Sequence, residues 1–194
     1  MACKGYPART RKTCASMRSA IRSSRWSHPA AVADAFGIGP EEIAATLAQT
    51  GPASPHRMAV TERDGILIID DSYNANPDSM RAGLDALETL GKGRRKIAVL
   101  GAMLELGEAS EAEHAAIGEY ACKSGVDVVV AVGQEMDALV AGAKAGGIEV
   151  VETGADTAID ALSPIMADGD VILFKGSNGS GVWRVADALV GKES

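Results

Sequence analysis

Apolar and polar positions along this chain follow two periodicities in turn, which predicts strands alternating with helices. Short apolar runs of strand length occur at residues 66–70, 96–100, 126–132, 148–151 and 171–174. Apolar positions recur at helical spacing over residues 80–90, 112–124, 135–145, 157–166 and 182–190. Strands that alternate with helices predict a mainly parallel sheet with helices packed against it.

The chain before this alternation predicts one further strand. Residues 58–62 and 66–70 flank a turn at Asp64 and Gly65, which indicates an antiparallel hairpin. The expected fold class is therefore α/β, with a Rossmann-like, mainly parallel sheet, flanking helices and an N-terminal antiparallel hairpin strand. Further upstream, residues 40–47 predict a short amphipathic helix with acidic residues in its first turn.

Composition adds an aliphatic core and an uneven charge to this picture. The 194 residues are 46% hydrophobic but only 4% aromatic, so Val, Ile, Leu and Ala must build the core. The net charge is −7, yet residues 1–27 carry seven bases and no acid. The other residues hold 12 bases against 26 acids, which argues against nucleic acid as a ligand.

The basic segment at residues 1–27 is similar to a transit peptide in its Arg and Ser content. It lacks a sustained helical stripe, and no continuous apolar run follows its charges, which excludes a secretory signal. We expect a disordered leader from a truncated or disrupted reading frame rather than an evolved basic arm. No stretch is long enough to cross a bilayer, so a cytoplasmic monomer is expected.

The most informative stretch is the turn after the first parallel strand, residues 70–80, with the sequence DDSYNANPDSM. Adjacent carboxylates, amides and a proline stand where a strand ends and a helix begins. In open α/β sheets, ligands bind at this end of the strands, where helix N-termini supply free N–H groups. The alternative is a plain strand-to-helix turn in which Asp and Asn only cap and bend the backbone.

Further polar segments follow other predicted strands, at residues 101–108, 133–134 and 175–181. Because the carboxyl ends of parallel strands share one edge of a sheet, that edge is the expected ligand face. The order of the strands cannot be read from the sequence, so which loops adjoin is left open. The glycines after residue 175 lack the G-x-G-x-x-G spacing of dinucleotide sites.

Four passages resemble, in order, the Mur ligases of peptidoglycan synthesis. They are HRM at residues 56–58, DDSYNANPDSM at 70–80, VLGAMLELGE at 99–108 and KGS at 175–177. Within the family, they are similar to the members that add D-alanyl-D-alanine to UDP-N-acetylmuramoyl-tripeptide. The resemblance implies a remnant of the central ATPase domain at residues 28–54 and a Mur ligase C-terminal domain at residues 55–194.

The resemblance also implies an activity that uses ATP and Mg2+. In such ligases ATP phosphorylates the tripeptide carboxylate, and the dipeptide amine then attacks the acyl phosphate. The phosphate-binding loop of the family, G-x-x-x-x-G-K-[ST], does not occur in this sequence. We therefore expect the last part of such an enzyme, inactive alone and without tight ATP or Mg2+ binding. The alternatives are a non-catalytic binding or regulatory module and a non-functional truncated gene product.

Site residues carry over from the family position by position. Arg57 matches an arginine that contacts phosphate, Asp71 matches an aspartate that holds the ribose hydroxyls, and Asn74 is expected on the same ATP side. The positions expected to bind the dipeptide are Tyr73, Asn76, Lys175 and Ser177. The alternatives are a surface pair with Glu62 for Arg57, helix capping for Asp71, and ordinary turn or cap roles for the asparagines.

Three positions depart from the family pattern. Ala102 stands where an aspartate is usual, Asn178 stands where an arginine usually follows KGS, and His56 replaces a usual glycine before the arginine. Relative to the family pattern, one carboxylate is therefore absent, and part of the contact to the dipeptide carboxylate is left open. No metal site is expected, because His28 and His114 have no partners at metal-ligand spacing and the cysteines show no metal or redox spacing.

Overall fold

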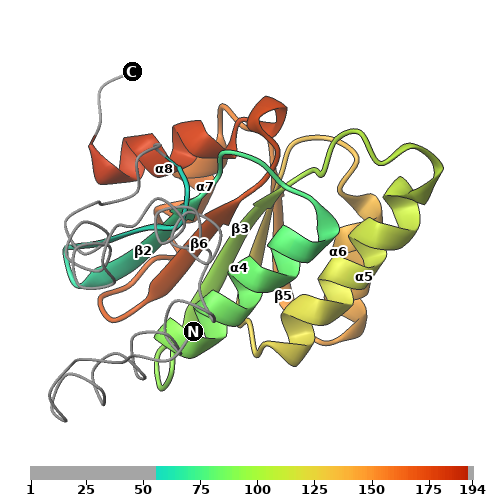
Figure 1. The fold of residues 1–194 in the computed structure, drawn as a ribbon. Helices are drawn as coiled ribbons and strands as arrows, with labels where there is room; N and C mark the ends of the chain where they lie inside the picture. The colour runs from blue at the N-terminus through green and yellow to red at the C-terminus, as the bar shows by residue number, and fades with distance from the viewer. Residues whose placement is uncertain (1–55, 192–194) are drawn as a thin grey trace, which may run out of the picture. The chain divides into compact units, whose positions relative to one another are not determined.

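The computed structural model describes residues 56–191, and in this part of the chain six strands form one sheet in the order β1-β2-β6-β3-β4-β5 (Figure 1). The strands are β1 (Ala59–Arg63), β2 (Ile66–Asp71), β3 (Lys96–Gly101), β4 (Val128–Val132), β5 (Glu149–Thr153) and β6 (Val171–Lys175). β1 pairs antiparallel with β2, and all other neighbours are parallel. The last strand in the sequence therefore lies inside the sheet, between β2 and β3.

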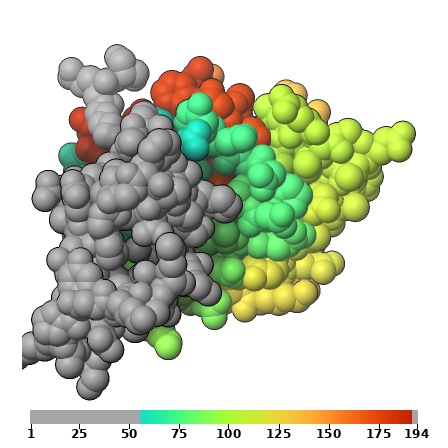
Figure 2. Space-filling model, viewed as in Figure 1, coloured from blue at the N-terminus to red at the C-terminus, as the bar shows by residue number. Residues whose placement is uncertain are grey.

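Helices cover both faces of this sheet. Their bounds are α4 (Pro77–Leu90), α5 (Ser110–Lys123), α6 (Asp137–Ala145), α7 (Ala158–Leu162) and α8 (Val182–Val190). The first three pack on one face and the last two on the other (Figure 1). The space-filling view shows α4 and α5 as the outer surface of the first face (Figure 2). No helix in the described part of the chain is long and apolar enough to span a membrane.

The central strands are apolar on both sides, as parallel strands between two helical layers must be. In β3, Ala98 and Leu100 belong to the core cluster under α4, α5 and α6, whereas Ile97 and Val99 belong to the cluster under α7 and α8. All four are buried. Each central strand supplies residues to two cores, which explains the continuous apolar runs in the sequence.

The structure confirms the α/β fold class and the antiparallel hairpin predicted from the sequence. The largest difference concerns the helix predicted at residues 157–166, which ends at Leu162. Pro164 explains the early end, because proline has no N–H and cannot continue the helical hydrogen bonds. The expectations for residues 1–27, 28–54 and 40–47 lie outside the described residues.

Two neighbouring arginines fix β6 at the amino ends of the parallel strands. Arg94 donates to the carbonyls of Gly65, Gly169 and Asp170. Arg95 holds the buried Asp170 carboxylate through two nitrogens, at 3.0 and 2.8 Å. The hydrogen bond to Asp170 raises the pKa of Arg95 above its ordinary value. Because Gly65 precedes β2 and Asp170 precedes β6, these bonds set the inserted strand beside its neighbour.

Helices α5 and α6 touch backbone to backbone at two glycines. A Cβ on Gly118 would lie 2.2 Å from the carbonyl oxygen of Leu139, and one on Gly142 would lie 2.5 Å from the carbonyl oxygen of Ala115. Only glycine permits such a close approach of two helices.

Gly118→Ala should therefore lower the free energy of unfolding, although alanine favours helices by about 1 kcal/mol. The added methyl group meets the backbone of α6, and overpacking of this kind costs about 1–3 kcal/mol or more. Gly154→Ala is the matched control, because the nearest atom to its Cβ would lie at ordinary contact distance, 3.6 Å. Urea unfolding of both variants measures the difference, and equal midpoints would contradict the close-contact argument.

Candidate functional site

Three loops meet at the carboxyl edge of the sheet, because β6 lies between β2 and β3. They are the loops at residues 72–76, 102–106 and 176–181. The strand register pairs Lys175 of β6 with Asp71 of β2 on one side and with Leu100 of β3 on the other. The DDSYNANP, LELGE and KGS passages of the sequence are thereby neighbours in space.

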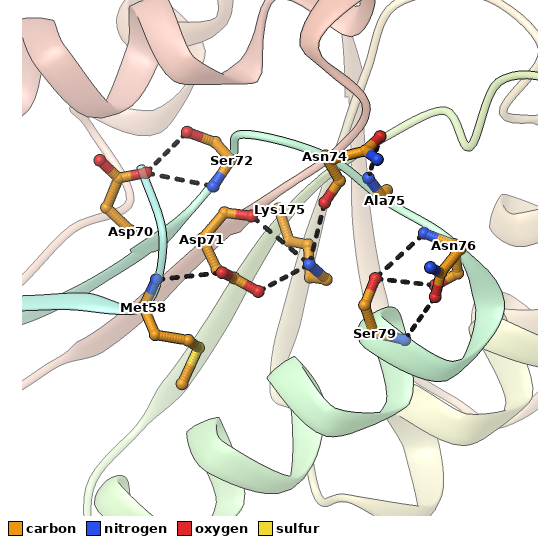
Figure 3. A network of polar contacts seen from close by, with 9 residues as sticks. All are labelled: Met58, Asp70, Asp71, Ser72, Asn74, Ala75, Asn76, Ser79 and Lys175. Carbon is orange, nitrogen blue, oxygen red and sulfur yellow. Dashed lines mark hydrogen bonds and ion pairs between the residues drawn. The ribbon is translucent and has the colours of Figure 1, made fainter. Parts of the chain in front are cut away.

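Asp71 and Lys175 form an ion pair at this edge (Figure 3). Lys175 Nζ lies 2.7 Å from Asp71 Oδ2 and also donates to the carbonyls of Asn74, at 3.1 Å, and of Asp71, at 3.4 Å. Asp71 Oδ1 accepts from the Met58 N–H at 3.0 Å. The Lys175 side chain is 1% exposed and the Asp71 side chain 18%, so solvent reaches the aspartate but not the lysine.

Asp70 serves the loop itself. Its carboxylate accepts from the Ser72 N–H at 3.2 Å and from the Ser72 hydroxyl at 2.6 Å, and it pairs with His56 Nδ1 at 2.8 Å. Asp70 is 4% exposed. Of the two adjacent aspartates, Asp71 is therefore the one that a ligand can reach.

A cluster that the sequence did not reveal joins His56 to two carboxylates. One ligand atom from each of His56, Asp70 and Asp187 lies within 4.8 Å of the others, which is close enough to hold a metal ion. His56 Nδ1 lies 2.8 Å from the carboxylate of Asp70, and His56 Nε2 lies 3.6 Å from that of Asp187. We interpret the cluster as a link between the first described residue and α8, because these contacts connect the two directly.

Arg57 is exposed and lies above the ring of Tyr73. Its Cζ is 4.1 Å from the ring centre, a cation–π contact. The residues on both sides adopt left-handed backbone, with φ of 61° at His56 and 50° at Met58. Among residues 56–191, the structure records no ion pair of Arg57, and the pair with Glu62 is not formed. Arg57 is thus an exposed cation whose recorded contact is the ring of Tyr73.

The two asparagines of the turn bond to nearby backbone. Asn76 caps α4: its side chain accepts from the Ser79 N–H at 2.8 Å, and the Ser79 hydroxyl accepts from the Asn76 N–H at 3.0 Å. Asn74 Oδ1 accepts from the Ala75 N–H at 2.9 Å. Both asparagines remain exposed at the edge of the sheet.

Ser177 organises the loop after β3. Its hydroxyl accepts from the Leu104 N–H at 3.0 Å, and the residue is 4% exposed. From the other side, buried His114 accepts the Met103 N–H at Nε2 and donates from Nδ1 to the Ser110 carbonyl, at 3.0 and 2.7 Å. This pair of bonds requires a neutral His114 with its proton on Nδ1.

The two departures in these loops have different surroundings. Ala102 is buried in the core cluster under α4, α5 and α6, and its carbonyl accepts from the Ser177 N–H at 3.0 Å. Asn178 is exposed at the start of the 3-10 turn Asn178–Ser180. The charge that the family resemblance implies at position 178 would therefore lie on the exposed side of this loop.

Comparison with known proteins identifies the family. The profile of the Mur ligase, glutamate ligase domain matches residues 56–178. The chain belongs to the Mur ligase family. It is 45% identical to the UDP-N-acetylmuramoyl-tripeptide--D-alanyl-D-alanine ligase of Mycobacterium tuberculosis (strain ATCC 25618 / H37Rv), over 85% of this chain and 37% of that protein. The Bacillus subtilis (strain 168) ligase of the same name is 31% identical, over 80% of this chain and 35% of its own length.

Solved Mur ligases share this fold. MurF from Acinetobacter baumannii superposes with a TM-score of 0.70 at 31% identity, covering 82% of this chain and 35% of that one. The MurF ligase from Thermotoga maritima in complex with ADP superposes with a TM-score of 0.57 at 28% identity, covering 77% and 36%. The chain thus spans little more than a third of the length of these four relatives, and it contains the C-terminal domain of the family.

The capping contacts at Asn76 lead to a prediction about stability. Asn76→Ala should lower the free energy of unfolding by about 1 kcal/mol, because the Ser79 N–H loses its acceptor. Asn76→Ser should stay close to the parent chain, since serine is an equally good N-cap. Thermal unfolding of both variants tests the cap, and identical losses for Ala and Ser would assign Asn76 a different role.

Proposed function

We propose that this chain acts as the C-terminal domain of an ATP-dependent ligase that joins D-alanyl-D-alanine to UDP-N-acetylmuramoyl-tripeptide. The observation that supports this most is that an accessible carboxylate, Asp71, and an exposed guanidinium, Arg57, both lie at the carboxyl edge of the sheet. The two are linked through the Met58 N–H, which donates to Asp71. The T. maritima relative, 28% identical, was solved with ADP, which supports a nucleotide as the ligand.

Each of the two residues suits one part of a nucleotide. A guanidinium binds phosphate oxygens with two parallel hydrogen bonds, and Arg57 has no carboxylate partner within residues 56–191 that would compete. A carboxylate has about four lone-pair sites, of which Met58 and Lys175 use two in Asp71. The remaining sites can accept the two ribose hydroxyls, and exposed Asn74 stands beside them.

The proposed reaction has two steps. The tripeptide carboxylate attacks the γ-phosphorus of ATP and forms an acyl phosphate with release of ADP; the amine of D-alanyl-D-alanine then attacks the acyl carbon, releasing phosphate and a proton. Mg2+ would neutralise phosphate charge, and we assign it no ligand in this chain. The contribution of this domain is to orient the nucleotide and to exclude water when it closes on the rest of the enzyme.

Of the four positions expected on the dipeptide side, Tyr73, Asn76, Lys175 and Ser177, direct contact is proposed for the exposed pair only. Tyr73 is 42% exposed and Asn76 is exposed, so both can meet a ligand at the closing face. Lys175 and Ser177 are buried, and their polar atoms bond within the domain. We therefore place the dipeptide against the exposed pair, with the buried pair beneath it.

The isolated 194-residue chain should show no ligase activity and only weak nucleotide binding. Arg57 and Asp71 cannot replace the backbone cradle and lysine of a phosphate-binding loop, which this sequence does not contain. Calorimetric titration with ATP in the presence of Mg2+ measures the affinity. A dissociation constant in the micromolar range or below would contradict this expectation and favour a nucleotide-binding module with its own function.

Grafting residues 56–194 onto a homologous ligase, in place of its C-terminal domain, tests the function directly. The 45% identical M. tuberculosis enzyme is a suitable host. In an active chimera, Arg57→Ala and Asp71→Ala should each lower kcat/KM for ATP by about tenfold to a hundredfold, the value of one charge-assisted hydrogen bond.

Arg184→Ala is the matched control for Arg57. Arg184 is also exposed and lies over an aromatic ring, that of Trp183 at 5.3 Å, but it belongs to α8. Its loss should leave kcat/KM for ATP within about twofold of the parent chimera, the scale of a surface contact. A folded chimera that stays fully active without Arg57 and Asp71 would overturn the nucleotide assignment.

A further inference from the structure

Lys175 is a buried cation in the middle of the carboxyl edge of the sheet, where the ligand is proposed to bind. It ends β6, where its neighbours in the sheet are Asp71 and Leu100. Its side chain is 1% exposed, although a lysine is almost never fully buried unless it is paired. Burying an ammonium group costs free energy, so the contacts around Lys175 should show what compensates for its burial.

The domain is built around the aliphatic part of this side chain. Gly83 lies in the interior of α4, where glycine costs about 1 kcal/mol relative to alanine in intrinsic helix stability. A Cβ at Gly83 would lie 2.9 Å from Lys175 Cδ and 3.6 Å from Cε. The missing side chain at Gly83 therefore leaves the space through which the lysine passes under α4.

The ammonium group of Lys175 uses its full donor capacity inside the domain (Figure 3). An ammonium has three N–H donors. The structure gives them three acceptors: Asp71 Oδ2 at 2.7 Å, the Asn74 carbonyl at 3.1 Å and the Asp71 carbonyl at 3.4 Å. No donor is left for the carboxylate of an incoming dipeptide, which would also have to reach an atom shielded from solvent.

We propose that Lys175 is a positioning residue for the nucleotide side of the site and does not contact the dipeptide. It holds the Asp71 carboxylate in one orientation and fixes the loop from Asp71 to Asn74. Through the Met58 N–H, which donates to the other oxygen of Asp71, it also fixes the turn that carries Arg57. One buried charge thus sets the positions of both residues proposed to hold ATP.

The part of this inference that concerns ATP rests on the proposed function, whereas the structural part can be tested on the chain itself. Amide hydrogen exchange of the 194-residue chain reports the Met58 N–H bond to Asp71 and the Tyr73 N–H bond to the His56 carbonyl. In Lys175→Met, both amides should exchange about tenfold faster or more, because each reports a hydrogen bond that loosens locally. The α5 and α6 amides should keep their rates.

Lys144→Met is the control, because Lys144 also pairs with a carboxylate at 2.8 Å but is 54% exposed. Its exchange pattern should match that of the parent chain. If Lys175→Met fails to fold, Gly83→Ala replaces it: the added methyl group displaces the lysine stem while the charge is kept. The same two amides should then exchange faster. Unchanged exchange at Met58 and Tyr73 in the folded variants would overturn the proposal.

Steady-state kinetics of the grafted ligase separate the two roles of Lys175. Positioning predicts that Lys175→Met raises KM for ATP or lowers kcat by about tenfold, with KM for D-alanyl-D-alanine unchanged within about twofold. A direct dipeptide contact predicts the reverse, a rise in the dipeptide KM alone, and that result would overturn the proposal. An inactive parent chimera would count against the proposed function, while hydrogen exchange would still decide the role of Lys175.

Discussion

The insertion of β6 between β2 and β3 is the constraint on which the site depends. Asp71 and Lys175 are 104 residues apart in the sequence, and only the parallel pairing of β2 with β6 brings them into contact. The arginines at the opposite edge act on the same strand, since they bind the residues that precede it. The inserted strand is thus held at both ends, by Asp170 at its start and by Lys175 at its finish.

The surroundings of Lys175 show how a charge can be buried beneath the carboxyl edge of the sheet. Moving an ammonium out of water costs several kcal/mol, and a carboxylate alone repays this only with good geometry and further hydrogen bonds. Here the backbone carbonyls of Asp71 and Asn74 supply those bonds. They belong to the segment that also carries the solvent-accessible carboxylate of Asp71. The same contacts that satisfy the lysine therefore also order the surface above it.

The sequence predicted the elements of this fold well, because long apolar runs and helical spacing are local properties. It also located the polar turn after β2, since strand ends are recognisable from the change in residue type. It did not reveal that Lys175 is buried or that His56, Asp70 and Asp187 meet, because both facts depend on the order of the strands. One local signal was available: the resemblance implies a glycine at the position of His56, where the backbone has positive φ.

The central place of the last strand also determines when the ligand edge can form during folding. Before β6 joins, the hairpin of β1 and β2 shares no strand pairing with β3, β4 and β5. Closing so long a loop costs entropy that rises only slowly with length, but pairing of distant parallel strands is slow. During synthesis, residues nearer the N-terminus fold first, so the apolar helical layer of α4, α5 and α6 is translated well before the site exists. The last twenty or so residues of the described chain are therefore the ones that turn two partial sheets into a binding surface.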